Sequence, residues 1–322
     1  MKKTMLFTIL AAMVPMSTAY ATSIDKSTPM TVVVPYSSGS VLDTAMRIVA
    51  DEYNNKFKEV IIIENKPGGG GAIAAQKVAR ANPDGKTVLM GSSGMLSINP
   101  HTHTELSYSP EKDFKPVTGF VAAPMLMAVN KDVPVKNVAE FVEWAKKNPD
   151  RANYGSFSTG NPSHFAGFIL NKATGAQLEN IPYTGGTRYI QDLVGGQLTS
   201  LFAQWLNLRS FYQDGRLKVI ATSAPQRSPE MPEVATFKEQ GLPELTFMMW
   251  TALIVPSNTP DNTVSALSER FKEAMTSPEV VKRLNDIDFQ PMPLSPAETR
   301  KFVQNESERW KDVVQQTGFK VN

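Results

Sequence analysis

A short run of small and hydroxylated residues, from Tyr36 to Ser40, is the first stretch of this sequence that could do chemistry. Residues 31–34 favour a strand, Pro35 ends that strand, and a helical pattern of apolar residues begins at Leu42. Such a loop brings peptide N–H groups and hydroxyls to a helix N-terminus without any lysine or arginine. This arrangement favours an anion such as a carboxylate, which dipoles rather than full charges would hold. The alternative is an ordinary turn whose serines only cap the helix.

Three further loops of small polar residues follow predicted strands. Residues 87–90 lead into Gly91-Ser92-Ser93-Gly94, residues 152–156 into a loop that ends at His164, and residues 178–182 into a loop that begins at Tyr183. Ligands of open α/β sheets bind at the carboxyl ends of strands, where these loops would lie. In the second loop, Asn161 and Pro162 predict an N-cap and a first helical turn. His164 would then either donate a hydrogen bond to a ligand or stack on its own loop.

Other chemistries find less support in the sequence. Gly69, Gly71 and Ala74 fit the G-x-G-x-x-A pattern of dinucleotide-binding loops, but no acidic residue follows about 20 positions later. The sequence contains no G-x-S-x-G nucleophile elbow. His101 and His103 could share a metal ion, yet no third ligand is recognisable, and two solvated loop histidines are the alternative. The sequence has no cysteine, which removes thiol catalysis and thiolate metal sites. We therefore expect neither a cofactor nor a metal.

The first 21 residues have the form of a secretory signal peptide. Lys2 and Lys3 precede a short apolar stretch at residues 5–14, and Ala19-Tyr20-Ala21 forms an A-x-A cleavage site. The apolar stretch is too short to span a bilayer. We expect cleavage after Ala21 and a protein that is soluble in a bacterial periplasm.

Charge and length limit the remaining classes. The 33 basic residues of the whole chain fall to 31 when Lys2 and Lys3 leave with the signal, which equals the 31 acidic residues. A neutral chain without a basic stripe argues against nucleic acid or an anionic membrane surface as partner. About 300 mature residues predict two domains, and stability must come from core burial because disulfides are impossible.

Strands and helices alternate along the chain. Residues 60–64 are so apolar that we expect helices to cover both faces of this strand. Residues 99–108 are polar and are expected to be irregular. The hydroxyl–proline pairs Thr259-Pro260, Ser277-Pro278 and Ser295-Pro296 each predict a helix start with proline in the first turn. The last helix, to about residue 317, is expected to pack on the outside of a domain.

A series of motifs in a fixed order resembles one known family. The series is PYSSGSVLD, IIENKPGGGGAIAAQKVARANPDGKTVLMGSSGMLSINP, NYGSFSTGNPSHFAG, IPYTGGTRYIQDLVGGQL, ATSAPQRSPEMPEVATFKEQGLPE and TPDNTV. It resembles the Bug family of extracytoplasmic solute receptors, the binding proteins of tripartite tricarboxylate transporters. The resemblance covers essentially the whole mature chain.

The resemblance implies an α/β fold of the two-lobed periplasmic binding protein type (type II, Venus flytrap), with two α/β domains joined by two crossover segments. Residues 22–123 and 251–322 would form one lobe, and residues 124–250 would form the other. Family ligands are mostly carboxylates, which backbone amides, hydroxyls and ordered waters hold between the lobes.

Carried onto this sequence, the resemblance implies a ligand site built from the four loops and from one residue that follows the strand ending at Phe202. The implied ligand-contacting residues are Tyr36, Ser37, Ser38, Gly39, Ser40, Ser92, Ser93, Ser158, Thr159, Asn161, Ser163, His164, Tyr183, Thr184, Gly185 and Gln204. Asp43 is expected to cap or orient its loop, because an acid in contact with the ligand would repel an anion.

This chain departs from the family pattern in two places. Family members usually read P-F-x-P-G-G-x-x-D at the first loop, whereas here Ser38 and Ser40 replace the second proline and the second glycine. The family also often has an aspartate after the strand that ends at Phe202, where this chain has Ala203-Gln204-Trp205. Loss of that acid argues against an amino-acid ligand.

Aliphatic di- or tricarboxylates and aromatic carboxylates both stay open as ligands. Trp205 would favour an aromatic ligand, and Trp205, Trp250, Phe157 and Phe165 could together form an aromatic wall, although aromatic side chains are more often part of a core.

The expected function is that of a monomeric receptor without enzymatic activity. It would capture a small-molecule carboxylate between two closing lobes and deliver it to the membrane subunits of a tripartite tricarboxylate transporter. The alternatives are a ligand-sensing subunit of a signalling system and a periplasmic dinucleotide-binding enzyme.

Overall fold

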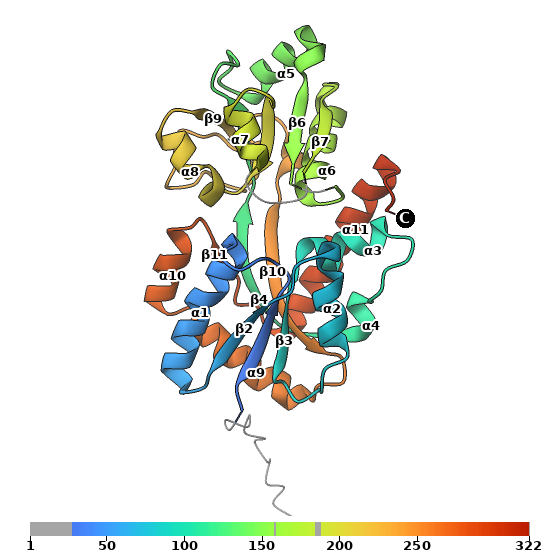
Figure 1. The fold of residues 1–322 in the computed structure, drawn as a ribbon, viewed down its shortest axis with the longest axis vertical. Helices are drawn as coiled ribbons and strands as arrows, with labels where there is room; N and C mark the ends of the chain where they lie inside the picture. Colours follow the sequence, from blue (N-terminus) through green and yellow to red (C-terminus); the bar gives the residue numbers. More distant parts are fainter. Residues whose placement is uncertain (1–27, 158, 184–187, 322) are drawn as a thin grey trace, which may run out of the picture.

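The computed structural model describes residues 28–157, 159–183 and 188–321, which form two lobes with one sheet each (Figure 1). Lobe 1 is built on a sheet of order β11-β4-β10-β3-β1-β2, and lobe 2 on a sheet of order β7-β6-β8-β5-β9. The strands of lobe 1 are β1 (Met30–Val34), β2 (Ile61–Asn65), β3 (Thr87–Ser92), β4 (Phe114–Pro124), β10 (Met248–Pro256) and β11 (Gln290–Pro291). Those of lobe 2 are β5 (Leu126–Asn130), β6 (Asn153–Ser156), β7 (Glu179–Pro182), β8 (Ser200–Ala203) and β9 (Leu217–Thr222). The α/β, two-lobed architecture expected from the sequence is therefore confirmed.

Helices cover both faces of the lobe 1 sheet. Strands β1, β2 and β3 are parallel, and β10 runs antiparallel to β3 and β4. Because side chains alternate along a strand, Val32 packs toward one face and Val33 toward the other. The first face is covered by α1 (Val41–Phe57), α9 (Asp261–Met275) and α10 (Pro278–Asn285). The second face is covered by α2 (Ala72–Ala79), the π-helical turn η2 (Gly94–Ile98) and part of α11 (Pro296–Thr317). Two short helices lie beside them, α3 (Asn99–Thr102) against η2 and α4 (Pro110–Asp113) against β4.

Lobe 2 has the same three-layer construction. Met127 and Val129 of β5 face α5 (Val138–Lys147) and α6 (Pro162–Thr174). Leu126 and Ala128 of the same strand face α7 (Arg188–Val194) and α8 (Trp205–Gln213). The carboxyl ends of β6 and β8, where α6 and α8 begin, point toward lobe 1 (Figure 1).

The chain crosses between the lobes at Met125 and returns at Phe247, and Ser223 holds the two crossings together. Ser223 Oγ donates to the Phe247 carbonyl at 2.6 Å and accepts from the Met125 amide at 2.8 Å. The backbone amide of Ser223 also donates to the Met125 carbonyl, and the Phe247 amide donates to the Ser223 carbonyl. Ser223 is buried, so water does not compete for these bonds.

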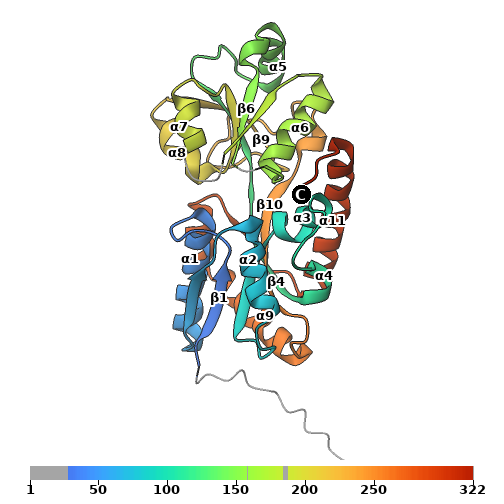
Figure 2. The ribbon, with the colours of Figure 1, turned by 45° about the vertical axis from the view of Figure 1, so that its right-hand side comes forward.

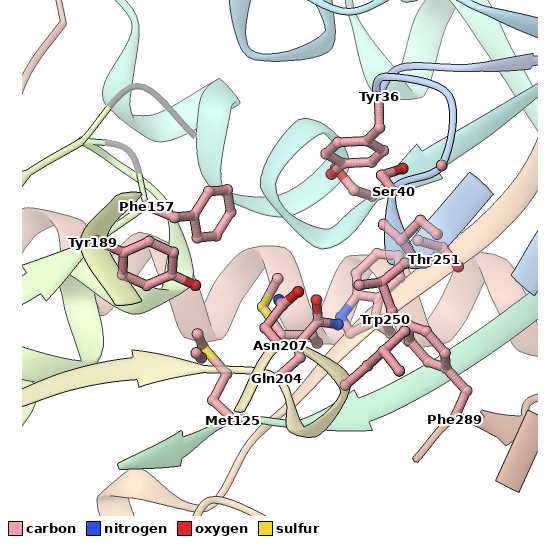
Figure 3. A pocket seen from close by; sticks show the side chains of 17 residues that line it. Tyr36, Ser40, Met125, Phe157, Tyr189, Gln204, Asn207, Trp250, Thr251 and Phe289 are labelled. Carbon is pink, nitrogen blue, oxygen red and sulfur yellow. The ribbon is translucent and has the colours of Figure 1, made fainter. Parts of the chain in front are cut away.

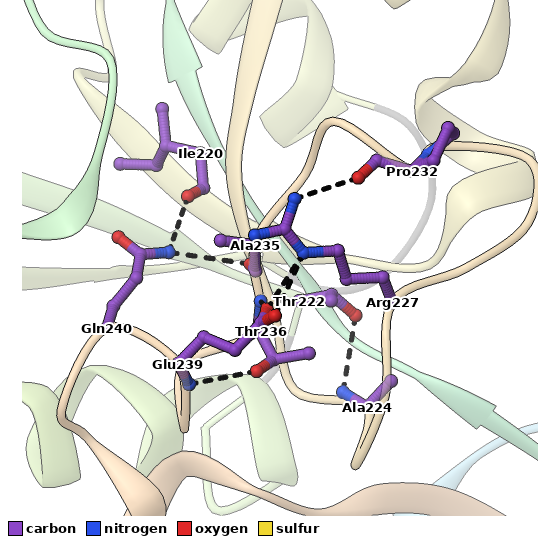
Figure 4. Close-up of polar contacts among 9 residues, drawn as sticks. All are labelled: Ile220, Thr222, Ala224, Arg227, Pro232, Ala235, Thr236, Glu239 and Gln240. Atoms are coloured by element: carbon purple, nitrogen blue, oxygen red, sulfur yellow. Dashed lines mark hydrogen bonds and ion pairs between the residues drawn. The ribbon is translucent and has the colours of Figure 1, made fainter.

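The long segment between β9 and β10 has little regular structure, and side-chain hydrogen bonds fix it instead (Figure 4). Arg227 forms an ion pair with Glu239 at 3.0 Å and donates to the Pro232 carbonyl. Gln240 Nε2 donates to the Ile220 carbonyl at 2.9 Å, which ties the segment to β9. These bonds attach the segment between β9 and β10 to lobe 2 before the chain returns to lobe 1.

Helix α11 belongs to both lobes. It starts beside the lobe 1 sheet and runs upward until it lies beside α6 (Figure 2). Trp310 and Val314 are buried in the lobe 2 core with Phe165. Beyond the helix, Phe319 packs against His164, while the backbone of Val321 bonds Thr102 and Thr104 of lobe 1. The helix packs on the outside of lobe 1 through Phe302 and Val303, as expected, but its apolar residues also extend past the lobe 1 sheet onto lobe 2.

Three local expectations are also corrected. Strand β2 is an edge strand whose Ile62 is 49% exposed, so helices do not cover both of its faces. Residues 99–102 are helical rather than irregular, because the buried Asn99 side chain donates to the Gly70 carbonyl and to the Tyr108 hydroxyl. Helix α9 begins after Pro260, which occupies the N-cap position itself, so Thr259 provides no cap.

The other predicted helix starts are confirmed. Asn161, Ser277 and Ser295 are N-caps with prolines directly after them, and Ser295 forms a capping box with Glu298. None of the helices within the described residues is both long enough and apolar enough for a membrane crossing.

Candidate functional site

A cavity of about 430 Å³ lies between the two lobes, where the carboxyl ends of strands from both sheets meet (Figure 3). Lobe 1 contributes Tyr36, Gly39, Ser40, Val41, Leu42, Ser92, Met249, Trp250, Thr251 and Phe289. Lobe 2 contributes Phe157, Tyr189, Ala203, Gln204, Leu206 and Asn207, and Met125 lines the cavity from the crossing. Among the described lining residues, none carries a charge.

The loop between β1 and α1 forms one wall of this cavity. Ser40 is the N-cap of α1, and its Oγ accepts from the Asp43 amide at 3.3 Å. Gly39 adopts a φ of +79°, in the left-handed region that favours glycine. Val41 and Leu42 form the first turn of α1, where backbone N–H groups have no partner inside the helix. Ser37 and Ser38 are exposed and do not line the cavity.

Asp43 holds this loop in place from behind. Its carboxylate accepts from the Gly39 amide at 2.8 Å, from Asn65 Nδ2 at 2.9 Å and from Arg47 at 2.8 and 3.1 Å. Burial by itself would raise the pKa of Asp43, but the bonds from Arg47, Asn65 and Gly39 outweigh it and lower the pKa. Asn65 also donates to the Tyr36 carbonyl, so the cluster fixes both ends of the loop. Sequence reasoning did not find Arg47 or Asn65, because neither belongs to the loop motif.

The end of β3 lies beside the first loop. Burial raises the pKa of the Tyr36 phenol, against the opposing effect of a hydrogen bond with Ser92. Ser92 Oγ also accepts from the Met95 amide at 3.4 Å, which starts the π-helical turn η2. π-Helical turns occur frequently at functional sites. Ser93 is buried outside the cavity lining, and its Oγ has no partner among the described residues.

Three polar side chains of lobe 2 line the cavity: Tyr189 of α7, and Gln204 and Asn207 at the start of α8. Tyr189 is 3% exposed, and its hydroxyl points into the cavity (Figure 3). Burial raises the pKa of this phenol, which stays neutral at pH 7. Gln204 is the N-cap position of α8, and Asn207 lies one turn into the helix. No described residue bonds the Tyr189 hydroxyl or either side-chain amide.

The loop before α6 is held by its own bonds. Asn161 Oδ1 accepts from the Ser163 and His164 amides and from Ser163 Oγ, at 2.7, 3.2 and 2.6 Å. The Phe157 amide donates to Ser163 Oγ, and the Gly160 amide donates to His164 Nδ1. These polar groups therefore position Phe157, which does line the cavity, and they do not line it themselves.

His164, Thr159 and Tyr183 lie away from the cavity lining. Burial lowers the pKa of His164, whose ring packs on Phe165 and Phe319. Thr159 is exposed. Tyr183 donates to Asp192 Oδ2 at 2.7 Å, and burial together with that carboxylate raises its pKa to about 12. Ser158, Thr184 and Gly185 fall outside the described residues.

The aromatic wall is built differently from the one considered in the sequence. Trp250 and Phe157 line the cavity, but Trp205 and Phe165 are buried in the lobe 2 cores. Tyr36, Tyr189 and Phe289 complete the wall instead. Trp250 Nε1 donates to Glu306 of α11 at 3.0 Å and its ring packs on Phe302, so Trp250 borders the cavity as part of the lobe 1 core. Trp250 comes from the extended segment after the return crossing, and Phe289 from a loop that carries no motif.

No group of three or more His, Cys, Asp or Glu side chains within the described residues could hold a metal ion. His101 Nε2 lies 2.8 Å from Ser307 Oγ and is half-buried against α11 rather than solvated. His103 pairs with Val321 through its backbone.

Comparison with known proteins gives the cavity a context. Residues 45–319 match the model of a family described as the tripartite tricarboxylate transporter family receptor. Protein BugT of Bordetella pertussis is 26% identical over 294 residues, which cover 91% of this chain and 90% of BugT.

Two solved structures from Rhodopseudomonas palustris are similar along nearly their whole length. MatC, solved with bound malate, is 32% identical with a TM-score of 0.78, and the match covers 89% of this chain and 98% of MatC. A second protein, solved with adipate, is 27% identical with a TM-score of 0.84, and the match covers 91% and 98% of the two chains.

Proposed function

The chain belongs to the tripartite tricarboxylate transporter receptor family, as the resemblance of its motifs to the Bug receptors predicts, and we propose that it captures a carboxylate in the periplasm and delivers it to the membrane subunits of such a transporter. Receptors of this family are solute-binding proteins, and we propose that this chain acts as a monomeric receptor rather than an enzyme. The lobes that close on the ligand would comprise residues 22–123 with 251–322, and residues 124–250.

One observation carries this proposal. The cavity lies between the first turns of two helices from different lobes, at Val41 and Leu42 of α1 and at Leu206 of α8. Backbone N–H groups in a first helical turn point along the positive end of the helix dipole. An anion held between them needs no cationic side chain, and the described lining offers none.

Hydroxyls and amides beside these helix starts supply further donors. We propose that Tyr36, Ser40 and Ser92 contact the ligand from lobe 1 and that Gln204 contacts it from lobe 2. Charge-assisted hydrogen bonds contribute about 1.5–3 kcal/mol each. About four to six of them would supply the roughly 8 kcal/mol of a micromolar complex after the costs of ordering and closure. Closure would strengthen each bond, because it removes competing water.

The similar proteins that carry malate and adipate support a carboxylate as ligand. The lining of this cavity also disfavours other classes. A sugar would present many hydroxyls to walls that are mostly apolar, and a cation would find no carboxylate in the described lining.

Calorimetry and thermal shift on the purified protein test the proposal. At least one of malate, adipate, benzoate and 4-hydroxybenzoate should bind and raise the melting temperature, whereas glucose, phosphate and NAD should not. Small-angle scattering should show compaction at saturation. Stabilisation by sugars alone, or an unchanged radius of gyration, would contradict the proposal.

A single added charge sharpens this test. Asn207→Asp places a carboxylate on the cavity wall in nearly the same volume, and it should weaken carboxylate binding at least about tenfold by repulsion. Asn258→Asp is the matched control, because Asn258 lies on an exposed turn at the far end of β10. Equal affinities of the two variants would show that the ligand does not bind beside Asn207 and the start of α8.

A further inference from the structure

We propose that the cavity selects an aromatic carboxylate whose ring carries an uncharged hydrogen-bonding group opposite the carboxylate, an inference that rests on the proposed function and narrows it. Two features of the lining point to this ligand class. The first is the aromatic chemistry of the apolar walls, and the second is the difference between the polar groups of the two lobes.

The apolar walls suit a flat ring. Phe157 and Tyr189 face the cavity from lobe 2, and Tyr36, Trp250 and Phe289 face it from lobe 1 (Figure 3). Aromatic side chains pack favourably against the faces and edges of another ring. A small hydroxy acid would turn oxygens toward these walls and lose water contacts without gaining partners.

Two methionines at the crossings extend the same surface. Met125 lies on the outgoing crossing and Met249 at the start of β10, just after the return crossing, and both line the cavity. Thioether sulfurs make favourable contacts with aromatic ring edges, and methionine adapts its shape to a ligand. A ring can therefore find apolar partners on both lobes and at the crossing.

The carboxylate end of the ligand fits lobe 1. Ser40 Oγ already accepts from the Asp43 amide, so its own hydrogen is left to donate toward the cavity. The first-turn N–H groups of Val41 and Leu42 lie beside it. Ser92 and Tyr36 line the same part of the cavity. These donors surround one anionic group with partial positive charge.

The opposite end offers groups that both donate and accept. The Tyr189 hydroxyl and the side-chain amides of Gln204 and Asn207 line lobe 2, and the described residues provide no partner for any of them. A hydroxyl, an amide or a ring nitrogen on the ligand could satisfy them as acceptor and donor together. A second carboxylate can only accept hydrogen bonds, so it would leave the amide oxygens of Gln204 and Asn207 without a donor. An ammonium group finds no carboxylate as counter-ion in the described lining either.

Calorimetry with five probes tests this assignment: 4-hydroxybenzoate, benzoate, terephthalate, adipate and malate. The expected order places 4-hydroxybenzoate first, with benzoate roughly tenfold weaker because it lacks the distal hydroxyl. Terephthalate, adipate and malate should each bind at least about tenfold more weakly than 4-hydroxybenzoate. Tighter binding of adipate, malate or terephthalate than of 4-hydroxybenzoate would overturn the assignment.

A variant pair ties the preference to one hydroxyl. Tyr189→Phe should weaken 4-hydroxybenzoate about tenfold and leave benzoate unchanged, whereas Tyr212→Phe should change neither. Tyr212 donates to Glu233 outside the cavity and is the matched control. Equal losses for both ligands in Tyr189→Phe would overturn the role of the phenol.

The two proposals fail in different ways. If none of the five probes and no other carboxylate binds the wild-type protein, the proposed receptor function fails. If carboxylates bind but aliphatic diacids bind best, the receptor function stands and the aromatic assignment fails. Melting curves of both tyrosine variants without ligand show whether they are folded.

Discussion

Replacing Asp43 with asparagine tests whether the loop before α1 is held from behind. Each carboxylate oxygen of Asp43 faces two donors: Oδ2 accepts from Gly39 and Arg47, and Oδ1 accepts from Arg47 and Asn65. An asparagine has the same shape, but its NH₂ group must face one of these donor pairs whichever way it is turned. The substitution therefore removes two hydrogen bonds and the charge while it keeps the volume.

The expected loss of unfolding free energy follows from this geometry. Hydrogen bonds to a charged group contribute about 1.5–3 kcal/mol each. The Asp43 side chain is 1% exposed, but Arg47 is 49% exposed, so solvent screens that part of the interaction. We expect a loss of about 2–4 kcal/mol at pH 7. Gly39 and Tyr36 also lose their anchor, so ligand affinity should fall at least about tenfold.

The pH dependence gives an independent signature. The folded protein lowers the pKa of Asp43 from its ordinary value of 3.8. A lowered carboxyl pKa contributes stability that is complete above the unfolded-state pKa and is lost as the pH falls through the folded-state pKa. The difference between wild type and Asp43→Asn should therefore be constant from pH 8 to about 5 and shrink below about 4.

Urea unfolding between pH 3 and 8 and calorimetry at pH 7 measure these quantities. Asp51→Asn is the matched control, because Asp51 lies on the same helix, is 62% exposed and is 3.7 Å from its partner Arg283. The control should change stability by no more than about 0.5 kcal/mol. Asp43→Asn with unchanged stability and unchanged affinity would refute the argument that this carboxylate fixes the loop.

Two further substitutions test other backbone and charge features. Gly39→Ala should lose about 1–2 kcal/mol because its φ of +79° is left-handed, although nothing lies within 4 Å of the new Cβ. Gly215→Ala is the control, because Gly215 has a φ of +66° and also has nothing within 4 Å of a new Cβ, so this variant should lose as much stability. Ligand affinity should fall only in Gly39→Ala, and equal affinities of the two variants would show that the loop before α1 does not contact the ligand. Burial and the nearby Glu230 raise the pKa of Asp288 to about 7. The folded state therefore keeps a proton that the unfolded state loses, and the free energy of unfolding falls as the pH rises from about 4 to 7. Asp288→Asn keeps a φ of +59° that asparagine tolerates, and it should be more stable than wild type at pH 8 by on the order of 2 kcal/mol. This gain is less than the full pKa shift implies because the side chain is partly exposed. At pH 4 the variant should be no more stable than wild type, and urea unfolding at both pH values would reveal the opposite trend.

The strand–loop–helix unit at residues 30–57 could be predicted because local rules decide it. Four residues with strand preference precede a proline, and Ser40 lies three residues before the amide that it caps. The caps at Asn161, Ser277 and Ser295 were predictable for the same reason. The cap at Thr259 was not, because the chain places Pro260 one position earlier relative to the helix than the pattern implies.

Much of the cavity lining could not be predicted, because it is assembled from single residues of distant elements. Tyr189 comes from the inner face of α7, beyond the loop of its motif from which ligand contacts were expected. Phe289 comes from a loop and Met125 from the crossing, and neither lies in a motif. Local patterns also do not reveal that a donor is already engaged. The Gly39 amide bonds Asp43, and the Ser163 hydroxyl bonds Asn161, so neither is available in the way that the loop sequences suggest.

The covering of β2 was mispredicted for a related reason. An apolar run predicts a strand, but it does not show whether the strand lies at the centre or the edge of its sheet. Ile62 and Val60 are about half exposed because β2 is the last strand of its sheet. Position in the sheet is a property of topology, which the residues of one strand do not encode.

The third link between the lobes restricts how a solute can enter. Ser223 connects both crossing strands, and α11 with Phe319 and Val321 connects the lobes on the side near α6. The α6 side of the molecule would therefore act as the hinge. Any opening that keeps these contacts must separate the two lobes on the side opposite α6 and α11. At that margin, Arg209 of α8 donates a hydrogen bond across the lobes to the Asp286 carbonyl at 3.3 Å, close to Phe289 of the cavity lining. That margin would move farthest for a given rotation of the lobes, so we expect the solute to enter there and the open and closed states to differ most on that part of the surface.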